Sequence, residues 1–232
     1  MNPLARRDFL RQGSWGLAAM GALGLTLKLH AEPTESSGEL GAPSVNPVIV
    51  PPVAPLADRA PTENNILGPY HRQGAPFRAK ITPPLEPGET LVVRGRVWAF
   101  DSKQPLAGAT LDIWQANAAG RYDNDDPDKP PAKGVYVNRA RLVTDETGYY
   151  EYETIKPGRY SIGPNRWRPA HIHYLIAAQG YKTLVTQLYF AGDPMNGQDE
   201  FIKKSLIISP EKINTPGGQF LLGTFDIVLA KA

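Results

Sequence analysis

Hydrophobic and polar side chains alternate in several short segments of the chain, which is the spacing of β-strands rather than of helices. The first such segment covers residues 91–100 and ends in the turn-rich residues 101–105. Further strands are expected at residues 110–116, 141–144, 149–154, 171–177, 183–190, 204–209 and 223–229. One short helical turn is expected at 198–204. The pattern predicts an all-β fold, an antiparallel β-sandwich with long loops and few or no helices.

The residues before this pattern have the features of an export signal. Arg6 and Arg7 precede a mild apolar run over 17–27, and Ala31 follows as a small residue at a cleavage position. The paired arginines resemble a twin-arginine signal, with a general secretory signal as the alternative. The apolar run is too short and too rich in glycine and alanine for a membrane span. We therefore expect export to the periplasm or beyond, by the twin-arginine route, with residues 1–31 as the signal peptide.

A proline-rich stretch separates this signal from the strand pattern. Residues 32–61 contain seven prolines and few large apolar side chains. Such a composition favours extended conformations that do not pack a core. We predict a linker or arm over 32–61 and one β-domain over 62–232.

Composition and charge remove several classes of function. The 232 residues are 41% hydrophobic and 21% charged, which argues against a disordered chain, and they include no cysteine. Disulfides, thiolate metal sites and cysteine nucleophiles are thereby excluded. The net charge is +2, but residues 1–31 carry +3, so the remainder carries −1 and has no basic run. Nucleic acid is therefore not an expected partner.

Two histidines and two tyrosines are the candidates for metal chemistry. His171 and His173 are two residues apart in a predicted strand, so their imidazoles project from the same face. A His-x-His pair alone is also compatible with a purely structural role. Tyr122 and Tyr160 each follow a predicted strand, in turns where side chains can reach a shared cleft. Phenolate and imidazole donors together favour ferric iron over zinc or copper.

Five motifs carry a resemblance to a known family. They are Leu111-Asp112-Ile113-Trp114-Gln115-Ala116 continuing to Gly120-Arg121-Tyr122, Asp145-x-x-Gly148-Tyr149-Tyr150, Lys156-Pro157-Gly158-Arg159-Tyr160, Trp167-Arg168-Pro169-Ala170-His171-Ile172-His173 and Thr186-Gln187-Leu188-Tyr189-Phe190. In this order they resemble the intradiol ring-cleavage dioxygenases, over roughly residues 62–230. Five linked motifs are far more specific than any one of them.

The resemblance implies a non-haem Fe(III) enzyme, with one iron per chain, that cleaves a catecholic ring with O2 to a cis,cis-muconate-type product. By position, Tyr122 and His171 match the family's equatorial ligands, and Tyr160 and His173 match the axial pair. Tyr160 matches the ligand that leaves when the substrate chelates.

Three further residues match positions around the family's iron. Arg168 matches the arginine that stabilises anionic character in the substrate ring, and Gln187 matches a residue that orients the reacting groups. Tyr70, in Gly68-Pro69-Tyr70, matches a residue of the substrate pocket. The alternatives to these roles are that Arg168 is an ordinary surface arginine and that Gln187 is a strand residue whose side chain hydrogen-bonds to the backbone.

Other interpretations and departures from the family pattern also have to be considered. A transthyretin-like binding module shares the sandwich turns but has no reason to carry the four donors, and phenolate ligands argue against a metal-dependent hydrolase. Residues 161–166 are shorter than in protocatechuate-type members and lack their tryptophan, so the ring substituents stay open. The helical dimerisation region of catechol-type members is absent, which leaves any homo-oligomer undefined. The acidic residues 123–128 are expected to form a solvated loop rather than a calcium site.

Overall fold

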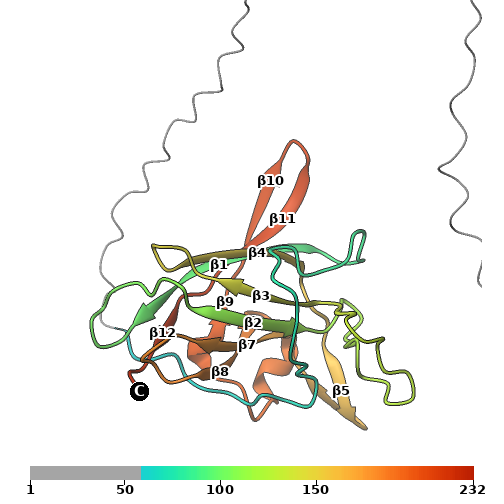
Figure 1. The fold of residues 1–232 in the computed structure, drawn as a ribbon. Helices are drawn as coiled ribbons and strands as arrows, with labels where there is room; N and C mark the ends of the chain where they lie inside the picture. The colour runs from blue at the N-terminus through green and yellow to red at the C-terminus, as the bar shows by residue number, and fades with distance from the viewer. Residues whose placement is uncertain (1–58) are drawn as a thin grey trace, which may run out of the picture. The chain divides into compact units, whose positions relative to one another are not determined.

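The computed structural model describes residues 59–232, so the predicted signal peptide and nearly all of the predicted linker lie outside the described residues. Within this range the chain is built from strands joined by turns and long loops (Figure 1). The strands are β1 (Thr90–Ala99), β2 (Thr110–Gln115), β3 (Arg139–Val143), β4 (Tyr149–Ile155), β5 (Tyr160–Gly163), β6 (Arg166–Arg168), β7 (His171–Ala177), β8 (Leu184–Phe190), β9 (Ile207–Ile208), β10 (Glu211–Thr215), β11 (Gly218–Thr224) and β12 (Ile227–Leu229). Two 3-10 turns cover Pro194–Gly197 and Lys204–Leu206.

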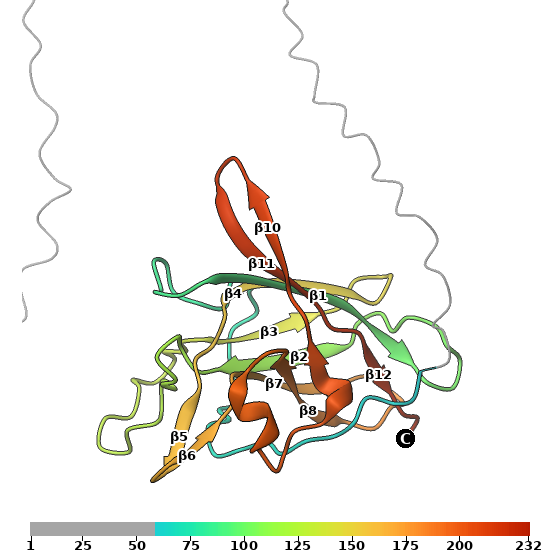
Figure 2. The ribbon, with the colours of Figure 1, turned by 180° about the vertical axis from the view of Figure 1, so that it is seen from behind.

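The strands form two five-stranded sheets and one separate hairpin. In one sheet the order is β10-β11-β1-β12, with β4 also paired to β1, and in the other it is β3-β2-β7-β8-β9. The β5–β6 hairpin stands apart from both sheets, and the β10–β11 hairpin projects beyond them in both views (Figures 1 and 2). None of the helical segments among residues 59–232 has the length and apolar character that crossing a membrane requires.

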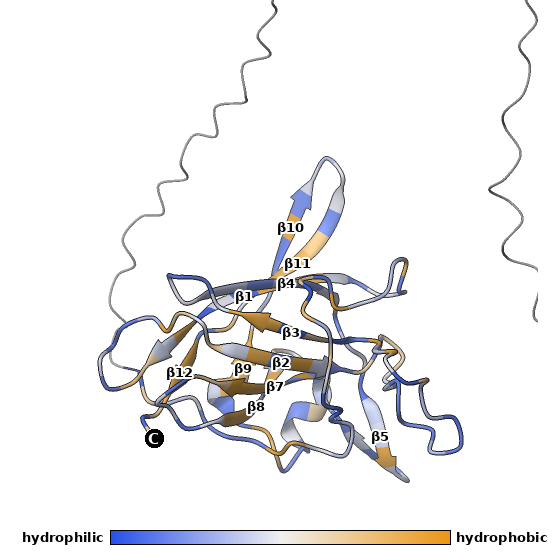
Figure 3. Cartoon of the chain, in the orientation of Figure 1, coloured by the Kyte–Doolittle hydropathy of each residue, from blue (hydrophilic) through white to orange (hydrophobic). Residues whose placement is uncertain are grey.

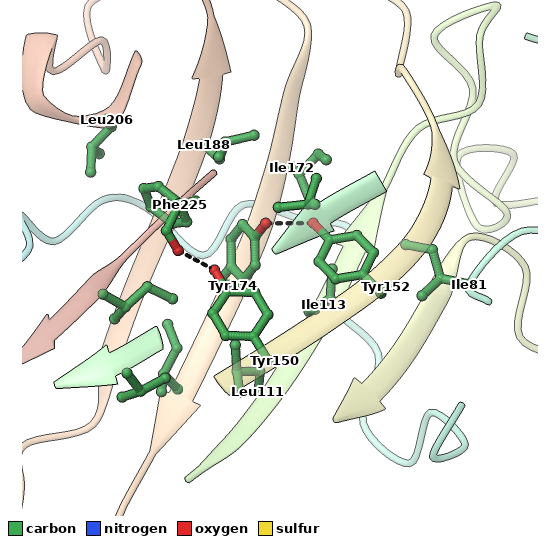
Figure 4. Packing of buried hydrophobic residues seen from close by; sticks show 14 of the residues in the cluster. Ile81, Leu111, Ile113, Tyr150, Tyr152, Ile172, Tyr174, Leu188, Leu206 and Phe225 are labelled. Atoms are coloured by element: carbon green, nitrogen blue, oxygen red, sulfur yellow. Dashed lines mark hydrogen bonds between the residues drawn. The ribbon is translucent and has the colours of Figure 1, made fainter. Parts of the chain in front are cut away.

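The core lies between the two sheets. In Figure 3 hydrophobic residues are concentrated in β2, β3 and β7. One cluster of buried hydrophobic residues joins these strands to β1, β4 and β8. Its centre is aromatic as well as aliphatic (Figure 4). There the hydroxyls of Tyr152 and Tyr174 hydrogen-bond each other, and Tyr150 donates to the carbonyl of Phe225 at 2.5 Å. These bonds satisfy phenol groups that would otherwise be buried without partners.

The prediction of an all-β sandwich is confirmed, and its sheets are mixed rather than wholly antiparallel. Strand β1 pairs in parallel with β11 and β12, and β8 pairs in parallel with β9. The short helical turn expected at 198–204 lies instead at Pro194–Gly197 and Lys204–Leu206. Because Lys204–Leu206 is helical, the strand expected at 204–209 is reduced to Ile207–Ile208.

Candidate metal centre

Strand β7 presents one face to the core and the other to a buried cluster of polar groups. Ile172, Tyr174 and Ile176 belong to the core, so the alternation of the strand places His171 and His173 on the opposite face, as the sequence predicts. The two imidazole Nε2 atoms are 3.1 Å apart, and both side chains are buried.

Both imidazoles are neutral in this environment. Burial lowers the pKa of His171 to about 3, and it lowers the pKa of His173 well below its ordinary value, with the neighbouring His171 and Arg168 acting in the same direction. The Nδ1 atom of His171 lies 2.7 Å from the carbonyl oxygen of Pro169, which makes Nδ1 the protonated nitrogen. The Nε2 atom of His171 therefore carries a free lone pair directed at the centre of the cluster.

The two predicted tyrosines lie beside these imidazoles. The Tyr122 hydroxyl is 3.5 Å from Nε2 of His171, and the Tyr160 ring lies edge-on to Tyr122 with centroids 5.6 Å apart. The Tyr160 ring is also 5.6 Å from the His171 ring. Burial raises the pKa of both phenols, strongly for Tyr122, while the Arg168 charge opposes the rise at Tyr160. The phenols therefore stay protonated unless a cation binds them.

Tyr70 belongs to the same cluster. Its ring stacks on Tyr122 with centroids 4.2 Å apart and lies edge-on to Tyr160 at 5.9 Å. The preceding turn approaches the histidines closely, since a Cβ added at Gly68 would lie 3.2 Å from Cε1 of His173, and Gly68 has φ +73°. The Gly68-Pro69-Tyr70 segment thus forms one wall of the cluster.

Arg168 and Gln187 complete the set of predicted residues. Both are buried, and the Arg168 Nη2 donates to Oε1 of Gln187 at 2.9 Å. Gln187 lies directly opposite His173 in the β7–β8 pairing, and its amide donates to the carbonyl of Ile66 at 2.8 Å. The structure therefore brings all seven predicted residues into one cluster, and the surface-arginine alternative for Arg168 is wrong.

The donor set fits a hard cation. Two neutral imidazole Nε2 atoms lie within 3.5 Å of each other or of the Tyr122 oxygen, and the Tyr160 ring packs beside them. Nδ1 of His173 has no hydrogen-bond partner among residues 59–232 to fix its tautomer. That range also contains no group of three or more histidine and carboxylate side chains placed to hold a metal. The tyrosines are the further side-chain donors that lie beside the imidazoles, and phenol oxygens with imidazoles suit a strongly Lewis-acidic metal.

Two glycines allow the tyrosine-bearing loops to approach each other. Gly120 has φ +76°, and a Cβ there would lie 2.1 Å from the carbonyl oxygen of Arg159. A Cβ on Gly158 would lie 2.2 Å from the carbonyl oxygen of Ala118. Real Cβ atoms do not come this close to backbone, so neither loop could keep its place with a larger residue. The distance between Tyr122 and Tyr160 depends on this contact.

Substitution Gly120→Ala is expected to weaken metal binding, because the methyl group would push the Arg159–Tyr160 backbone away from the Tyr122 loop. The measurement is iron content after purification together with the visible absorption of the protein. Gly134→Ala is the matched control, since Gly134 has φ +80° and open space around its Cβ position. The control carries only the backbone cost, about 1 kcal/mol. Equal iron binding in the two variants would contradict the proposed role of the contact.

The sequence also missed several residues that hold the cluster in place. The acidic loop is not fully solvated, because the Asp123 side chain is 4% exposed and accepts from Arg139 Nε at 2.8 Å and from Arg72 Nη1 at 2.7 Å. This ion pair fixes the residue next to Tyr122. Asp199 and Tyr189 contact Arg168 in the interior. Tyr189 shares a strand face with Gln187 and could have been found by that spacing, whereas Asp199 lies in a loop with no sequence signal.

Comparison with known proteins agrees with this geometry. Residues 66–231 match a family model described as Dioxygenase. The chain is 34% identical over 189 residues to the chlorocatechol 1,2-dioxygenase of Rhodococcus opacus, covering 72% of each chain. It is 38% identical over 174 residues to the protocatechuate 3,4-dioxygenase beta chain of Burkholderia cepacia, covering 70% of this chain and 73% of the relative.

A solved structure shares the fold as well. The crystal structure of the 3-chlorocatechol 1,2-dioxygenase from Rhodococcus opacus 1CP superposes with a TM-score of 0.68 at 34% identity, covering 74% of this chain and 73% of that one. Nothing in these matches supports the transthyretin-like binding module. The family model, the relatives and the fold together show that this chain belongs to the intradiol ring-cleavage dioxygenases, a family of oxidoreductases.

Proposed function

We propose that the protein cleaves a 1,2-dihydroxybenzene between its two hydroxyl-bearing carbons, using a non-haem Fe(III) held by Tyr122, Tyr160, His171 and His173. The observation that carries this proposal is that two tyrosine rings and two neutral imidazoles gather in one cluster. The names of the relatives support the substrate class, since chlorocatechol and protocatechuate are both vicinal dihydroxybenzenes. Both oxygen atoms of O2 enter the product, so the reaction needs no external reductant.

Bound iron would supply a Lewis acid and a template that chelates the two catechol oxygens. Tyr122 and Tyr160 act as phenolates in this state and supply two negative charges to a site whose imidazoles are neutral. These charges would offset two of the three positive charges of a buried trivalent cation, which lowers the cost of burying it.

Tyr160 is the phenol that gives way to the substrate. Tyr122 is only 4% exposed and is covered by the Tyr70 ring, whereas Tyr160 is half-buried on the separate β5–β6 hairpin. A half-buried ligand on a hairpin outside the two sheets can move with less repacking than a fully buried one. When a catechol binds as its dianion, the Oη of Tyr160 would take up one of its two protons and solvent would take the other, while Tyr122 stays in place.

Arg168 and Gln187 act on the bound ring. The guanidinium of Arg168 lies beside Tyr160 and favours negative charge there, as its lowering effect on the pKa of Tyr160 indicates. A fixed cation at this position stabilises the anionic ring as it reacts with O2. Gln187 holds that guanidinium from the opposite strand and ties it to the wall at Ile66.

The place of action is part of the proposal. The arginine pair and apolar run of residues 1–31 support export of the enzyme by the twin-arginine route, which carries folded proteins. An enzyme that needs iron at a buried site would then receive it before export. Fusing residues 1–31 to a reporter and replacing Arg6 and Arg7 with lysines is expected to stop export of the reporter.

The visible absorption spectrum tests the proposal directly. The purified protein loaded with Fe(III) is expected to be coloured through a tyrosinate-to-iron transition, and anaerobic addition of catechol is expected to shift that band. Resorcinol is the control, because its 1,3-hydroxyls cannot chelate one metal and should leave the band unchanged. A protein that stays colourless after reconstitution with Fe(III) would rule out the phenolate ligands.

A further inference from the structure

Arg168 is held on two sides by residues from distant parts of the chain. Its Nε donates to Oδ2 of Asp199 at 2.9 Å, and its Nη2 is also 2.9 Å from that oxygen. Both side chains are 3% exposed, so the ion pair is buried. The Nη2 further donates to Oε1 of Gln187 and to the hydroxyl of Tyr189, each at 2.9 Å.

The carboxylate of Asp199 is itself fixed. Its Oδ1 accepts the backbone N–H of Phe201 at 2.9 Å, and the Phe201 ring lies under the guanidinium, with Cζ of Arg168 4.9 Å from the ring centroid. The carbonyl of Phe201 accepts from the Asn65 amide at 2.7 Å. The segment 199–201 therefore contacts the guanidinium at its edge and on its face, and the Asn65 amide anchors this segment through the Phe201 carbonyl.

This arrangement determines which edge of the guanidinium is free. The Nε and Nη2 donors are used by Asp199, Gln187 and Tyr189, and Arg168 lies directly opposite Tyr160 in the β5–β6 pairing. A free arginine side chain has several accessible rotamers. A planar guanidinium that is held by hydrogen bonds along one edge keeps only one orientation. The pairing also lets a cation stay buried beside a metal site, since an unpaired buried charge is costly.

We propose that Asp199 is a positioning residue for ring cleavage, which acts by holding the free edge of Arg168 toward the substrate and toward Tyr160. This inference rests on the proposed function, because it requires that Arg168 acts on a bound catecholate. The hydrogen bonds of Asp199 go to Arg168 and to the backbone N–H of Phe201, and none goes to the four donor groups, so we expect Asp199 to act on the reaction through the guanidinium.

Substitution Asp199→Asn tests the proposal, because it keeps the size of the side chain and removes its charge. We expect kcat for catechol to fall about 10- to 100-fold, the range for residues that orient a metal-site group. The tyrosinate band and its anaerobic shift with catechol are expected to stay. The matched control is Glu200→Gln, which neutralises the neighbouring carboxylate, whose side chain is 69% exposed, and is expected to leave turnover unchanged.

A double-mutant cycle separates positioning from a structural role. In an Arg168→Ala background, Asp199→Asn is expected to cause no further loss of kcat, because the group through which it acts is gone. If the two losses multiply instead, Asp199 acts by another route and the proposal is overturned. If Asp199→Asn does not yield folded protein, Asp199→Glu keeps the charge, shifts the carboxylate by one methylene and serves in the same cycle.

The remaining outcomes distinguish this inference from the proposed function. Loss of the tyrosinate band in the Asp199→Asn protein would make Asp199 a structural residue of the centre and overturn the inference. Full turnover in that protein, with turnover lost in Arg168→Ala, would overturn the inference alone. Full turnover in Arg168→Ala would contradict the role given to Arg168 in the proposed function.

Discussion

Replacing His171 with alanine is expected to remove iron and turnover together. The Nε2 lone pair of His171 points into the cluster and is 3.1 Å from Nε2 of His173 and 3.5 Å from the Tyr122 hydroxyl. Without this imidazole the site would keep three of its four protein donors. We expect the visible band to disappear and kcat/KM to fall at least about 10³-fold, or about 4 kcal/mol of transition-state stabilisation.

The control for this substitution is His71, a described histidine that is not one of the four donors. His71 packs against Trp114 with ring centroids 4.6 Å apart and lies 3.2 Å from Oδ2 of Asp112, and it is not directed into the donor cluster. His71→Ala is expected to keep both the band and the bound iron. Iron content by metal analysis and the absorption spectrum report the two variants side by side. A His171→Ala protein that still holds one iron per chain would show that the ligands had been assigned wrongly.

Arg168→Ala is expected to separate iron binding from catalysis. The guanidinium is not among the four donors, so the tyrosinate band and its anaerobic shift with catechol should persist. Turnover should fall about 10²- to 10³-fold, the usual cost of removing a group that stabilises developing charge. Stopped-flow mixing of the catechol complex with O2 would place the loss in the step after substrate binding. The expected result is a lower kcat with little change in the dissociation constant for catechol.

This substitution also has a cost in stability. Removing Arg168 leaves the 3%-exposed carboxylate of Asp199 without its partner, which costs about 3–5 kcal/mol for a buried pair. Melting experiments should therefore show a lower Tm for Arg168→Ala, and assays belong well below that temperature. The control is Arg166→Ala. Arg166 is on the same strand, but its side chain is 66% exposed and its ion pair with Glu200 is long, at 3.8 Å. An equal loss of turnover in both variants would mean that neither arginine acts specifically.

The sequence predicts those strands in which hydrophobic and polar side chains alternate strongly. Strand β7 was placed at its observed bounds, because His171 and His173 alternate with large apolar residues and a strand leaves each set on its own face. Strand β10 was missed, since Ile213 is its one apolar residue, and β6 has only three residues. The parallel pairing of β1 with β11 and β12 depends on segments far apart in sequence, which no local pattern encodes.

The same distinction applies to the site. The four donors and Arg168 lie in motifs with fixed internal spacing, so their positions could be predicted. Asp199 reaches Arg168 from a loop after β8, and Asp123 is buried only because Arg72 and Arg139 come from distant segments to neutralise it. A run of carboxylates looks solvated when its partners are not adjacent in sequence. Residues that support the site therefore could not be identified from the sequence where their role depends on tertiary contacts.

The pairing of β1 with β12 also determines when the domain can close. Val97, Trp98 and Ala99 pair in parallel with Ile227, Val228 and Leu229, so part of β1 has no partner on this edge until a segment much later in the sequence has been synthesised. Contacts of such long range form late and slow the folding of β proteins. Until then one edge of β1 is unpaired and exposed to other chains. The order of synthesis therefore delays closure of this sheet, and any capture of iron by the finished site, until β12 has been synthesised.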